Sequence, residues 1–577
     1  EIRTRLVGSE MCIRDRDGPV LLEGEGLRRT EAIQGVNMRY DVLNLILGWT
    51  LLALLLPLAL CGVITWWLDG WVLAAQAFLP AMLISGGLGA IMLGLFTRTD
   101  SAQRLRDLEA FVGVGLVWPL TVLIGALPYW FGGVFVGPFV EDALAIDIMR
   151  GFVNSWFESM SGFTTSGATV LSHSMSPNCI PGTTPDCINA QPQGLLLWRS
   201  LTQWLGGMGV VMLGMLVLSR IIGGGMALAR AELTGPSLSR LRPKLRQTAM
   251  ALWGLYLLLT LVEMLALKFI GGMTVFDSVN HAFTTMPSGG FSTRDASIAY
   301  YDSATIELII IVFMFLAGVN FTLMWLFGAG DFKAALKDEE FRTYLLYITA
   351  AVLVIVTSLV LVGMALGHAL LDTLFHVLSI GTSTGYASAN YADWPGVARI
   401  ILLLLMIVGA CAGSTSGGLK LMRIRIGLKV AFRELARIAQ PRKIHMIRMN
   451  NEVVEDKQVS LVVGMLFIWV ILFGFSCIVL GMMMPDASFE TIFSVAASGL
   501  GNTGPALGAY GPTETWASMN SGSLLFTSVL MWFGRLELLT AIIVLHPHSW
   551  RREEKSDGER QGMAMVKRIL DREDDED

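Results

Sequence analysis

Long apolar stretches alternate with short polar connections along most of the chain. A helix needs about 20 mostly apolar residues to cross the roughly 30 Å hydrocarbon layer of a membrane. Ten stretches meet or nearly meet this requirement: 42–67, 71–96, 109–131, 195–220, 248–270, 304–328, 343–366, 396–425, 458–484 and 521–545. The pattern predicts an all-α integral membrane protein with about ten transmembrane spans.

Basic residues indicate which connections face the cytoplasm. They concentrate in the connections 97–107, 220–246, 331–342 and 420–448, whereas the alternate connections hold few, chiefly Arg150, Lys268 and Arg294. Lysine and arginine accumulate in the cytoplasmic loops of membrane proteins. We therefore expect these four connections to lie inside the cell and, with ten spans, both termini to be cytoplasmic.

The composition agrees with a protein embedded in a lipid bilayer. Of the 577 residues, 53% are hydrophobic and 15% are charged, against about a quarter charged in soluble domains. The net charge of −5 is small for this length and predicts no nucleic-acid partner. Residues 1–16 contain no apolar core of signal-peptide length. We interpret them as a sequencing or gene-calling artefact and leave them out of the fold prediction.

The cysteines leave one question open. Six cysteines do not make a disulfide scaffold in a chain of this length. Cys179 and Cys187 lie in a connection expected outside the membrane, where a disulfide can form. Two unpaired thiols are equally compatible with the sequence.

Four shorter apolar segments, at about 153–163, 276–286, 372–381 and 489–498, lie on the outer side between pairs of spans. Segments this short are more often re-entrant or buried than spanning. Each precedes a polar turn, and the four turns align on Gly167, Gly290, Gly385 and Gly504. About thirteen residues before these glycines stand four residues of helix-capping types, Asn154, Asp277, Asp372 and Thr491. The sequence therefore predicts four copies of a capped short helix followed by a glycine turn.

Such a pattern suits the passage of a cation. A cation that leaves water needs oxygen atoms to replace its hydration shell, and rings of backbone carbonyls supply them. The backbone must then turn successive carbonyls to one side, which requires dihedral angles that glycine tolerates. Non-helical backbone at membrane depth is acceptable where it lines a water-filled path. Short helices can also point their negative C-terminal ends at the ion.

The turns resemble degenerate, single-chain versions of the potassium-channel filter Thr-x-Gly-Tyr-Gly, and Ser383-Thr-Gly-Tyr-Ala387 is the nearest copy. From about residue 40 to 550 the chain resembles the TrkH family of bacterial Trk potassium uptake systems, within the Trk/Ktr/HKT superfamily. The most specific matches are the segments Ser159–Thr169, Trp198–Gly209, Gly409–Lys420 and Gly501–Pro505. The resemblance implies four helix–pore loop–helix repeats around a central pore, preceded by two extra helices, in the bacterial inner membrane.

On this basis we expect an N-terminal segment at 1–39, two extra helices at 40–97, and repeats at 98–222, 223–330, 331–440 and 441–548. A charged cytoplasmic tail follows at 549–577. In the superfamily, glycine at all four filter positions accompanies potassium selectivity, so the resemblance implies K⁺ as the transported ion. The expected filter residues are Thr165, Ser166, Gly167, Ser288, Gly289, Gly290, Ser383, Thr384, Gly385, Asn502, Thr503 and Gly504. The second turn departs from the pattern, with Ser288-Gly-Gly290 where a threonine is expected.

The eighth predicted span is interrupted by small residues. Gly413, Ser414, Thr415, Ser416, Gly417 and Gly418 follow one another. Small residues can serve close helix packing, but this density favours an unwound polar loop. The resemblance implies an intramembrane gating loop that works with Arg535, an ionisable residue within the last span. Arg199 and Gln203 in the fourth span are expected to bond pore-loop carbonyls and hold the filter in shape.

The sequence also bears on two alternative functions and on the partners of the chain. A symporter that couples K⁺ to H⁺ or Na⁺ is an alternative on the same fold, although no buried chain of carboxylates suggests a proton relay. A membrane-embedded enzyme or sensor would need clustered acids, histidines or metal ligands, which the sequence lacks, and no organic cofactor is expected. The resemblance implies a homodimer and a cytoplasmic TrkA-type nucleotide-binding regulatory subunit. The basic stretches 220–246 and 427–450 are natural docking faces, unless they only reflect the ordinary cytoplasmic charge bias.

Overall fold

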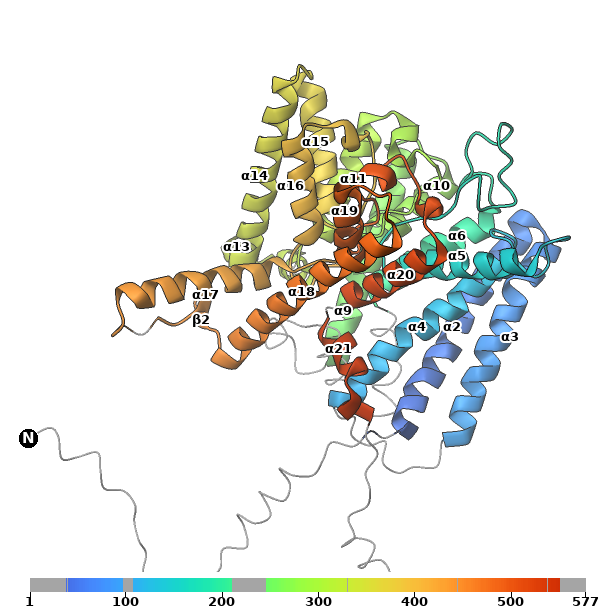
Figure 1. The fold of residues 1–577 in the computed structure, drawn as a ribbon, viewed down its shortest axis with the longest axis horizontal. Helices are drawn as coiled ribbons and strands as arrows, with labels where there is room; N and C mark the ends of the chain where they lie inside the picture. Colours follow the sequence, from blue (N-terminus) through green and yellow to red (C-terminus); the bar gives the residue numbers. More distant parts are fainter. Residues whose placement is uncertain are drawn as a thin grey trace, which may run out of the picture. The chain divides into compact units, whose positions relative to one another are not determined.

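The computed structural model describes residues 38, 40–96, 107–209, 245–328, 330–443, 445–536 and 538–550. In these ranges the chain is mostly helical, with one two-stranded hairpin (Figure 1). The chain divides into two compact units, Arg39–His546 on one side and Glu1–Met38 with Pro547–Asp577 on the other. Of the second unit the structure describes Met38 and the short helix η7 (Pro547–Trp550). Residues 1–16, most of 97–107, most of 220–246 and the tail from 551 lie outside the described residues.

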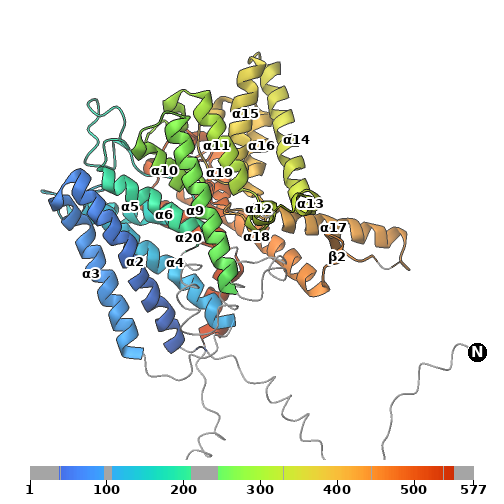
Figure 2. The same cartoon turned by 180° about the vertical axis from the view of Figure 1, so that it is seen from behind.

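Two long helices begin the compact unit Arg39–His546, as expected. α2 (Tyr40–Asp69) and α3 (Trp71–Phe96) are joined at Gly70, whose φ of 102° lets the chain reverse direction. The helices pack closely, because Gly48 of α2 faces Gly89 of α3. A Cβ at either glycine would lie 3.2 Å from the carbonyl oxygen of the other. Figure 2 shows the two helices side by side.

Four helix–turn–helix units follow along the chain. The first contains α4 (Asp107–Phe131), α5 (Ala145–Phe163) and α6 (Gln193–Gly207). The second contains α9 (Leu245–Phe269), α10 (Val275–Thr285), η3 (Ser297–Tyr301), α11 (Ala304–Ala317) and α12 (Phe321–Gly328). The third contains α13 (Phe332–Lys337), α14 (Glu339–Leu361), α15 (Leu366–Gly381), η4 (Tyr391–Asp393), α16 (Gly396–Ile407) and α17 (Leu421–Ala439). The fourth contains α18 (Asp456–Met483), α19 (Phe489–Gly501), η5 (Gly508–Tyr510), η6 (Trp516–Ser518), α20 (Ser521–Arg535) and α21 (Leu539–Leu545).

The all-helical membrane architecture is confirmed. Six described helices are long and apolar enough to cross a bilayer: α2, α3, α4, α9, α14 and α18. The pair α11 and α12 passes the same test together but bends by 104° at its break. Within the remaining three expected spans the structure describes the shorter helices α6, α16 and α20, and residues 210–220 of the first of these spans lie outside the described residues. The chain is therefore a multi-pass membrane protein.

A break was expected only in the eighth span, but the second helix of other units also stops early. α11 ends at Ala317, and α20 ends at Arg535 before Leu538 adopts a φ of 64°. The break after α11 is stabilised from another unit, since Cys411 N–H donates to Gly318 O and Phe321 N–H donates to Gly413 O. Backbone groups freed at membrane depth need such partners. Gly318 and Asn320 are the only local signs of this break in the otherwise apolar sequence of 304–328, and they did not lead us to expect it.

The predicted helix caps were wrong. The residues at the N-cap positions of α5, α10, α15 and α19 are Leu144, Thr274, Ala365 and Ser488. Asp277 and Thr491 instead stand three residues after caps whose hydroxyls accept their backbone N–H groups. Asn154 and Asp372 lie inside longer helices. Upstream apolar residues extend these two helices beyond the expected start.

The basic stretch expected as a cytoplasmic loop at 420–448 is largely a helix. α17 begins at Leu421 and runs to Ala439, and it is followed by the antiparallel strands β1 (Arg448–Met449) and β2 (Glu452–Val453). A small apolar cluster joins these elements to the start of α18, formed by Ile426, Ile447, Met449, Val454 and Val459. The eighth apolar stretch therefore divides into α16, a non-helical segment and the first turn of α17.

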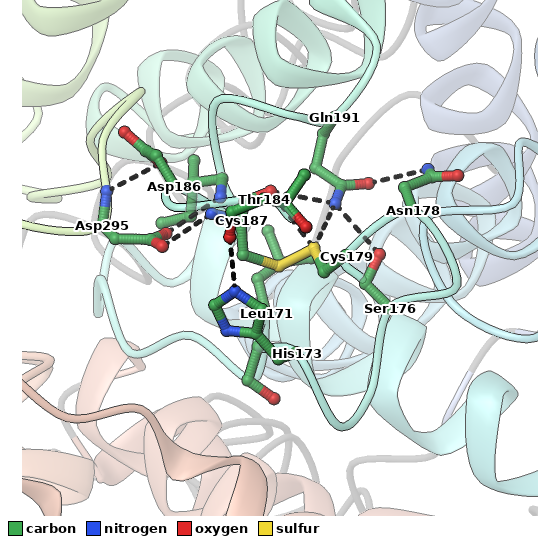
Figure 3. Close-up of a disulfide and its surroundings, with 12 residues drawn as sticks. Leu171, His173, Ser176, Asn178, Cys179, Thr184, Asp186, Cys187, Gln191 and Asp295 are labelled. Carbon is green, nitrogen blue, oxygen red and sulfur yellow. Dashed lines mark hydrogen bonds between the residues drawn. A yellow bond between two sulfur atoms is a disulfide. The ribbon is translucent and has the colours of Figure 1, made fainter. Parts of the chain in front are cut away.

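The connection between α5 and α6 contains a disulfide between Cys179 and Cys187, whose Cα atoms lie 5.3 Å apart (Figure 3). The backbone N–H groups of Cys187 and Ile188 donate to the carboxylate of Asp295 at 2.6 and 2.9 Å. Gln191 also donates to Cys187 O at 3.1 Å. The disulfide loop of the first helix–turn–helix unit is thereby attached to the chain segment that follows the second glycine turn.

Replacing both disulfide cysteines with serine should lower the free energy of unfolding. For a loop of eight residues the chain-entropy model gives about 2.5 kcal/mol. Thermal unfolding in detergent, with and without reductant, measures this effect. Cys477→Ser, which removes a half-buried free thiol, is the matched control. A reductant-sensitive midpoint in the double variant, or an unchanged midpoint, would contradict the prediction.

Asn320 should stabilise the restart of the helix after the break. Its Oδ1 accepts the N–H of Thr322 at 2.8 Å, at the start of α12. Asn320→Ala should cost about 1 kcal/mol, as for other N-cap residues, and lower the thermal midpoint in detergent. Asn189→Ala serves as the control because Asn189 is exposed and is not the N-cap residue of a described helix. Equal midpoints for the two variants would show that the cap contributes nothing.

Candidate ion pathway

The four glycine turns share one backbone conformation. The aligned glycines have φ values of 83° at Gly167, 76° at Gly290, 82° at Gly385 and 96° at Gly504. The residues two places earlier have φ values of 54° at Thr165, 58° at Ser288, 58° at Ser383 and 52° at Asn502. Left-handed backbone at a non-glycine residue costs about 1–3 kcal/mol. Its recurrence at four equivalent positions indicates one constraint acting on all four turns.

The second turn keeps this register despite its different sequence. Ser288 occupies the position of Thr165 and Ser383, and Gly290 occupies that of the other aligned glycines. The departure from the pattern lies at Gly289, where the other turns carry Ser166, Thr384 and Thr503, and it leaves the path of the backbone intact.

Each turn is tied back to the end of its own short helix. The N–H before each aligned glycine donates to the carbonyl five residues earlier. These bonds are Ser166 to Ser161 at 2.9 Å, Gly289 to Thr284 at 2.8 Å, Thr384 to Ser379 at 2.7 Å and Thr503 to Ser498 at 3.1 Å. Backbone bonds of this kind hold the strained conformation, because unpaired buried amides would cost free energy.

The turns pack against one another in a closed cycle. A Cβ at Gly167 would lie 2.2 Å from the carbonyl oxygen of Gly289, and one at Gly290 would lie 1.8 Å from that of Thr384. A Cβ at Gly385 would lie 2.1 Å from the oxygen of Thr503, and one at Gly504 would lie 2.3 Å from that of Ser166. The turns thus follow each other in chain order around a ring. We call the carbonyl oxygens of Ser166, Gly289, Thr384 and Thr503 the carbonyl ring.

Two hollows lie on opposite sides of the glycine turns. The outer one has a volume of about 340 Å³, and all four aligned glycines contribute to its lining. The inner one, about 110 Å³, is lined by Gly413–Gly418 and Arg535. The segment expected to form a gating loop thus contributes six residues to the lining of the inner hollow.

Arg199 and Gln203 bond the second turn, as expected from the sequence. Arg199 Nη1 donates to Ser292 O at 2.9 Å, and Gln203 Nε2 donates to Gly289 O at 2.7 Å. Arg199 also forms a buried ion pair with Glu158 at 2.6 Å. Glu158 accepts from Val170 N–H at 3.1 Å, so one ion pair holds the chain beyond both the first and the second turns. The sequence analysis missed Glu158, although it is the one acid in the segment 153–163.

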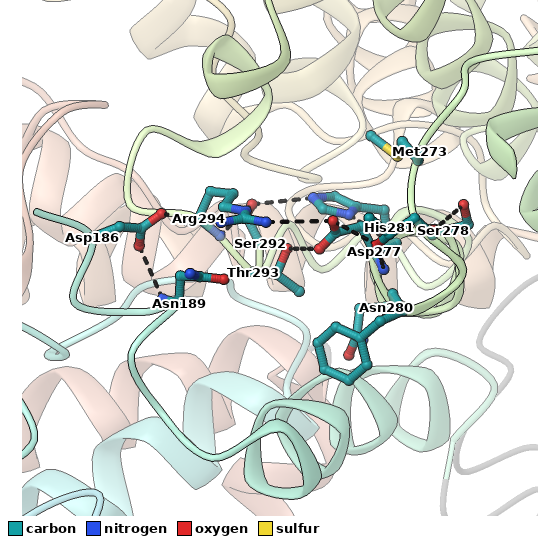
Figure 4. Close-up of polar contacts among 12 residues, drawn as sticks. Asp186, Asn189, Met273, Asp277, Ser278, Asn280, His281, Ser292, Thr293 and Arg294 are labelled. Carbon is teal, nitrogen blue, oxygen red and sulfur yellow. Dashed lines mark hydrogen bonds and ion pairs between the residues drawn. The ribbon is translucent and has the colours of Figure 1, made fainter. Parts of the chain in front are cut away.

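Two histidines hold the chain where it leaves the second and third turns. His281 of α10 bonds Asp277 O through Nδ1 at 2.8 Å and Ser292 Oγ through Nε2 at 3.1 Å. His376 of α15 has the equivalent Nδ1 contact with Asp372 O at 2.7 Å. Figure 4 shows His281 within the polar network that joins α10 to the segment at Ser292. These contacts fit a structural role for both side chains.

The segment Gly409–Lys420 lies directly below the glycine turns and bonds two of them. Thr415 Oγ1 shares a hydrogen bond with Ser288 Oγ at 3.0 Å, and Gly417 N–H donates to Ser383 Oγ at 2.6 Å. Gly417 also has no room for a side chain, since a Cβ there would lie 2.3 Å from Gly501 O. The non-helical conformation of this segment is as the sequence predicted.

Arg535 connects the first turn to this segment. Its Nη1 donates to Thr165 Oγ1 and to Thr415 O, both at 3.1 Å. Its Nη2 donates to the carbonyls of Gly206 at 2.5 Å and Gly207 at 3.0 Å, at the C-terminal end of α6. The guanidinium therefore lies between the turn, the segment and a helix end, in the lining of the inner hollow.

Glu340, which the sequence analysis missed, anchors the segment to α14. Its Oε1 accepts the backbone N–H groups of Ala412 at 2.6 Å and Met422 at 3.1 Å. The neighbouring Glu339 pairs with Arg425 at 2.9 Å and with Lys429 at 2.7 Å, both on α17. Glu339 and Glu340 end a run of three consecutive acids, Asp338–Glu340, at the start of an apolar stretch, and this run was the available signal. The two glutamates link the segment and α17 to the same helix end.

The chain is similar to known proteins over most of its length. The family model TrkH, described as a cation transport protein, matches residues 95–551. The chain is 34% identical over 485 residues to the Trk system potassium uptake protein TrkH of Salmonella typhimurium, covering 83% of this chain and 93% of that protein. It is 29% identical over 459 residues to the Trk system potassium uptake protein TrkG of Escherichia coli, covering 79% and 88%.

The fold also has a solved counterpart. The crystal structure of the potassium transporter TrkH from Vibrio parahaemolyticus matches with a TM-score of 0.74 at 28% identity, over 89% of this chain and 100% of that one. The helices and glycine turns described above thus occur within a fold already known for a transporter. The chain belongs to the TrkH family of cation transport proteins.

Proposed function

We propose that this protein takes up K⁺ across the bacterial inner membrane through the carbonyl ring. The proposal rests mainly on the closed cycle of four glycine turns between an outer and an inner hollow. It is supported by the relatives, which are named as potassium uptake proteins and potassium transporters rather than enzymes. The bacterial inner membrane and cytoplasmic termini are part of the proposal, on the grounds of the family and of the charge bias between loops.

The filter in this proposal consists of the residues 165–167, 288–290, 383–385 and 502–504. Their carbonyls replace the hydration shell of K⁺ without introducing a fixed charge. The absence of a side chain at the aligned glycines is what allows each turn to approach the next. K⁺ is the transported ion and is not held as a permanent cofactor.

The gate consists of Gly413–Gly418 and Arg535. The segment fills the path below the ring, and the positive charge of Arg535 opposes a cation entering the inner hollow. Transport then requires both to move. Because Arg535 bonds Thr415 O, displacement of the segment Gly413–Gly418 breaks its contact with Arg535, and displacement of Arg535 frees the segment.

A cytoplasmic TrkA-type nucleotide-binding subunit regulates this gate, and the transporter acts as a homodimer. Both partners follow from the family resemblance. The basic stretch 427–450, which includes most of α17 and β1, is the proposed docking face. A force on α17 would reach Glu339, whose neighbour Glu340 bonds the gating segment. The other proposed docking stretch, 220–246, lies mostly outside the described residues.

Gly385→Ser should reduce uptake of rubidium-86 into proteoliposomes by at least about tenfold. The serine Cβ would lie 2.1 Å from Thr503 O, at a backbone φ of 82° that costs about 1–3 kcal/mol for a side chain. Gly396→Ser is the control, because Gly396 has open space around its Cα. In the unchanged protein, excess cold K⁺ should block the flux and excess Na⁺ should not. Flux that K⁺ leaves unblocked would overturn the proposal.

Arg535→Ala should increase rubidium-86 uptake in the absence of any regulatory subunit. A unit charge about 4 Å away opposes a cation by about 1 kcal/mol even in bulk water, so we expect at least about a fivefold increase. Arg442→Ala, at an exposed position, should leave the rate unchanged. A lower rate in Arg535→Ala, with the folded protein recovered in equal amount, would contradict a gating role.

A further inference from the structure

The second glycine turn lacks hydroxyl groups that two other turns use for support. In the first turn Thr164 Oγ1 and Ser166 Oγ share a hydrogen bond at 2.9 Å. In the third turn Thr382 and Thr384 have the equivalent contact at 2.8 Å. The corresponding residues of the second turn are Pro287 and Gly289, which have no hydroxyl. The carbonyl of Gly289 nevertheless belongs to the carbonyl ring.

The side-chain amide of Gln203 takes the place of these hydroxyls. Its Nε2 donates to Gly289 O at 2.7 Å, and its Oε1 accepts the N–H of Phe291 at 3.1 Å. One side chain from α6 therefore bonds the residues on both sides of Gly290. Gln203 is fully buried, so water does not compete for these bonds.

Gln203 leaves no room for a side chain at position 289. A Cβ at Gly289 would lie 2.4 Å from both Cδ and Oε1 of Gln203. The backbone itself does not require glycine at this position, since Gly289 is not among the residues with positive φ. The equivalent ring positions carry Ser166, Thr384 and Thr503. Gly289 and Gln203 thus form a matched pair, in which the missing side chain of one provides the space for the other.

A carbonyl oxygen has two lone pairs. Gln203 occupies one of them on Gly289 O, and the same oxygen faces Gly167 at the junction between the first and second turns. The amide fixes the direction of this carbonyl without covering the ring.

We propose that Gln203 is a positioning residue that sets ion selectivity by orienting the Gly289 carbonyl, and that Gly289 is present to admit it. This inference rests on the proposed uptake of K⁺ through the carbonyl ring. Loss of the amide leaves the Gly289 carbonyl free to turn. The ring then loses its preference between ions before it loses its ability to conduct.

The test compares rubidium-86 and sodium-22 uptake into proteoliposomes for Gln203→Met, Gly289→Ser and the double variant Gln203→Ala/Gly289→Ser. Methionine has a similar length to glutamine but provides neither bond. Gln203→Met should lower the preference for rubidium over sodium by about tenfold, as expected for loss of a neutral hydrogen bond. Its maximal rubidium rate should change less. Gln193→Ala, at an exposed position on the same helix, is the matched control.

Gly289→Ser alone should strongly impair uptake, because the serine Cβ would clash with Cδ and Oε1 of Gln203 at 2.4 Å and push the second turn out of place. Adding Gln203→Ala should restore part of that uptake, since it removes the clash and leaves a serine as in the first turn. Residues that act independently would instead give multiplied effects. Multiplied effects, a harmless Gly289→Ser, or unchanged ion preference in Gln203→Met would each overturn the inference. If the unchanged protein carries no rubidium, the proposed function itself fails, so the two failures are distinguishable.

Discussion

The close approach between each carbonyl-ring oxygen and the aligned glycine of the preceding turn is the constraint on which the rest of the structure depends. At the four junctions a Cβ would lie 1.8–2.3 Å from an oxygen, which no side chain can occupy. The cycle closes only when all four turns are present, so no single repeat can form it. The short helices α5, α10, α15 and α19 must therefore end at the same depth. Their final carbonyls hold the turns that follow, and the surrounding helices position these ends.

Because all four turns belong to one chain, different side chains can support each junction between them. Identical subunits would have to support all four junctions in the same way. Gln203 and Arg199 of the first repeat bond the second turn and the chain that follows it. Tyr386 of the third turn contacts the hydroxyls of α10, and Asn502 of the fourth turn donates to Ser166 Oγ at 3.0 Å. The backbone of the four turns is nearly fourfold, whereas the side chains behind them are not. Degenerate turn sequences are compatible with a regular ring because the support can come from a neighbouring repeat.

The break in the second repeat and the non-helical segment of the third repeat form one polar unit. The segment donates to carbonyls at the end of α11, and its own Gly413 carbonyl accepts from the start of α12. Any movement of the segment must find new partners for these groups, because unpaired backbone is costly at membrane depth. Arg535 and Glu340 add charge-assisted bonds to the same unit. The observed arrangement of this polar unit is thus held by specific contacts from three parts of the chain.

The sequence by itself determined the membrane class, the positions of the four glycine turns, the non-helical segment at 409–420 and the charged position of Arg535. These features depend on local composition and on repetition along the chain. The tertiary structure alone decided the break between Ala317 and Phe321, the helical state of α17, the order of the turns around the ring and the pairing of Gln203 with Gly289. Each of these depends on partners distant in the sequence: Gly413 bonds Phe321, and Gln203 lies 86 residues before Gly289. A hydrophobic pattern records where the chain is buried, but it does not record which backbone group will be satisfied by which distant neighbour.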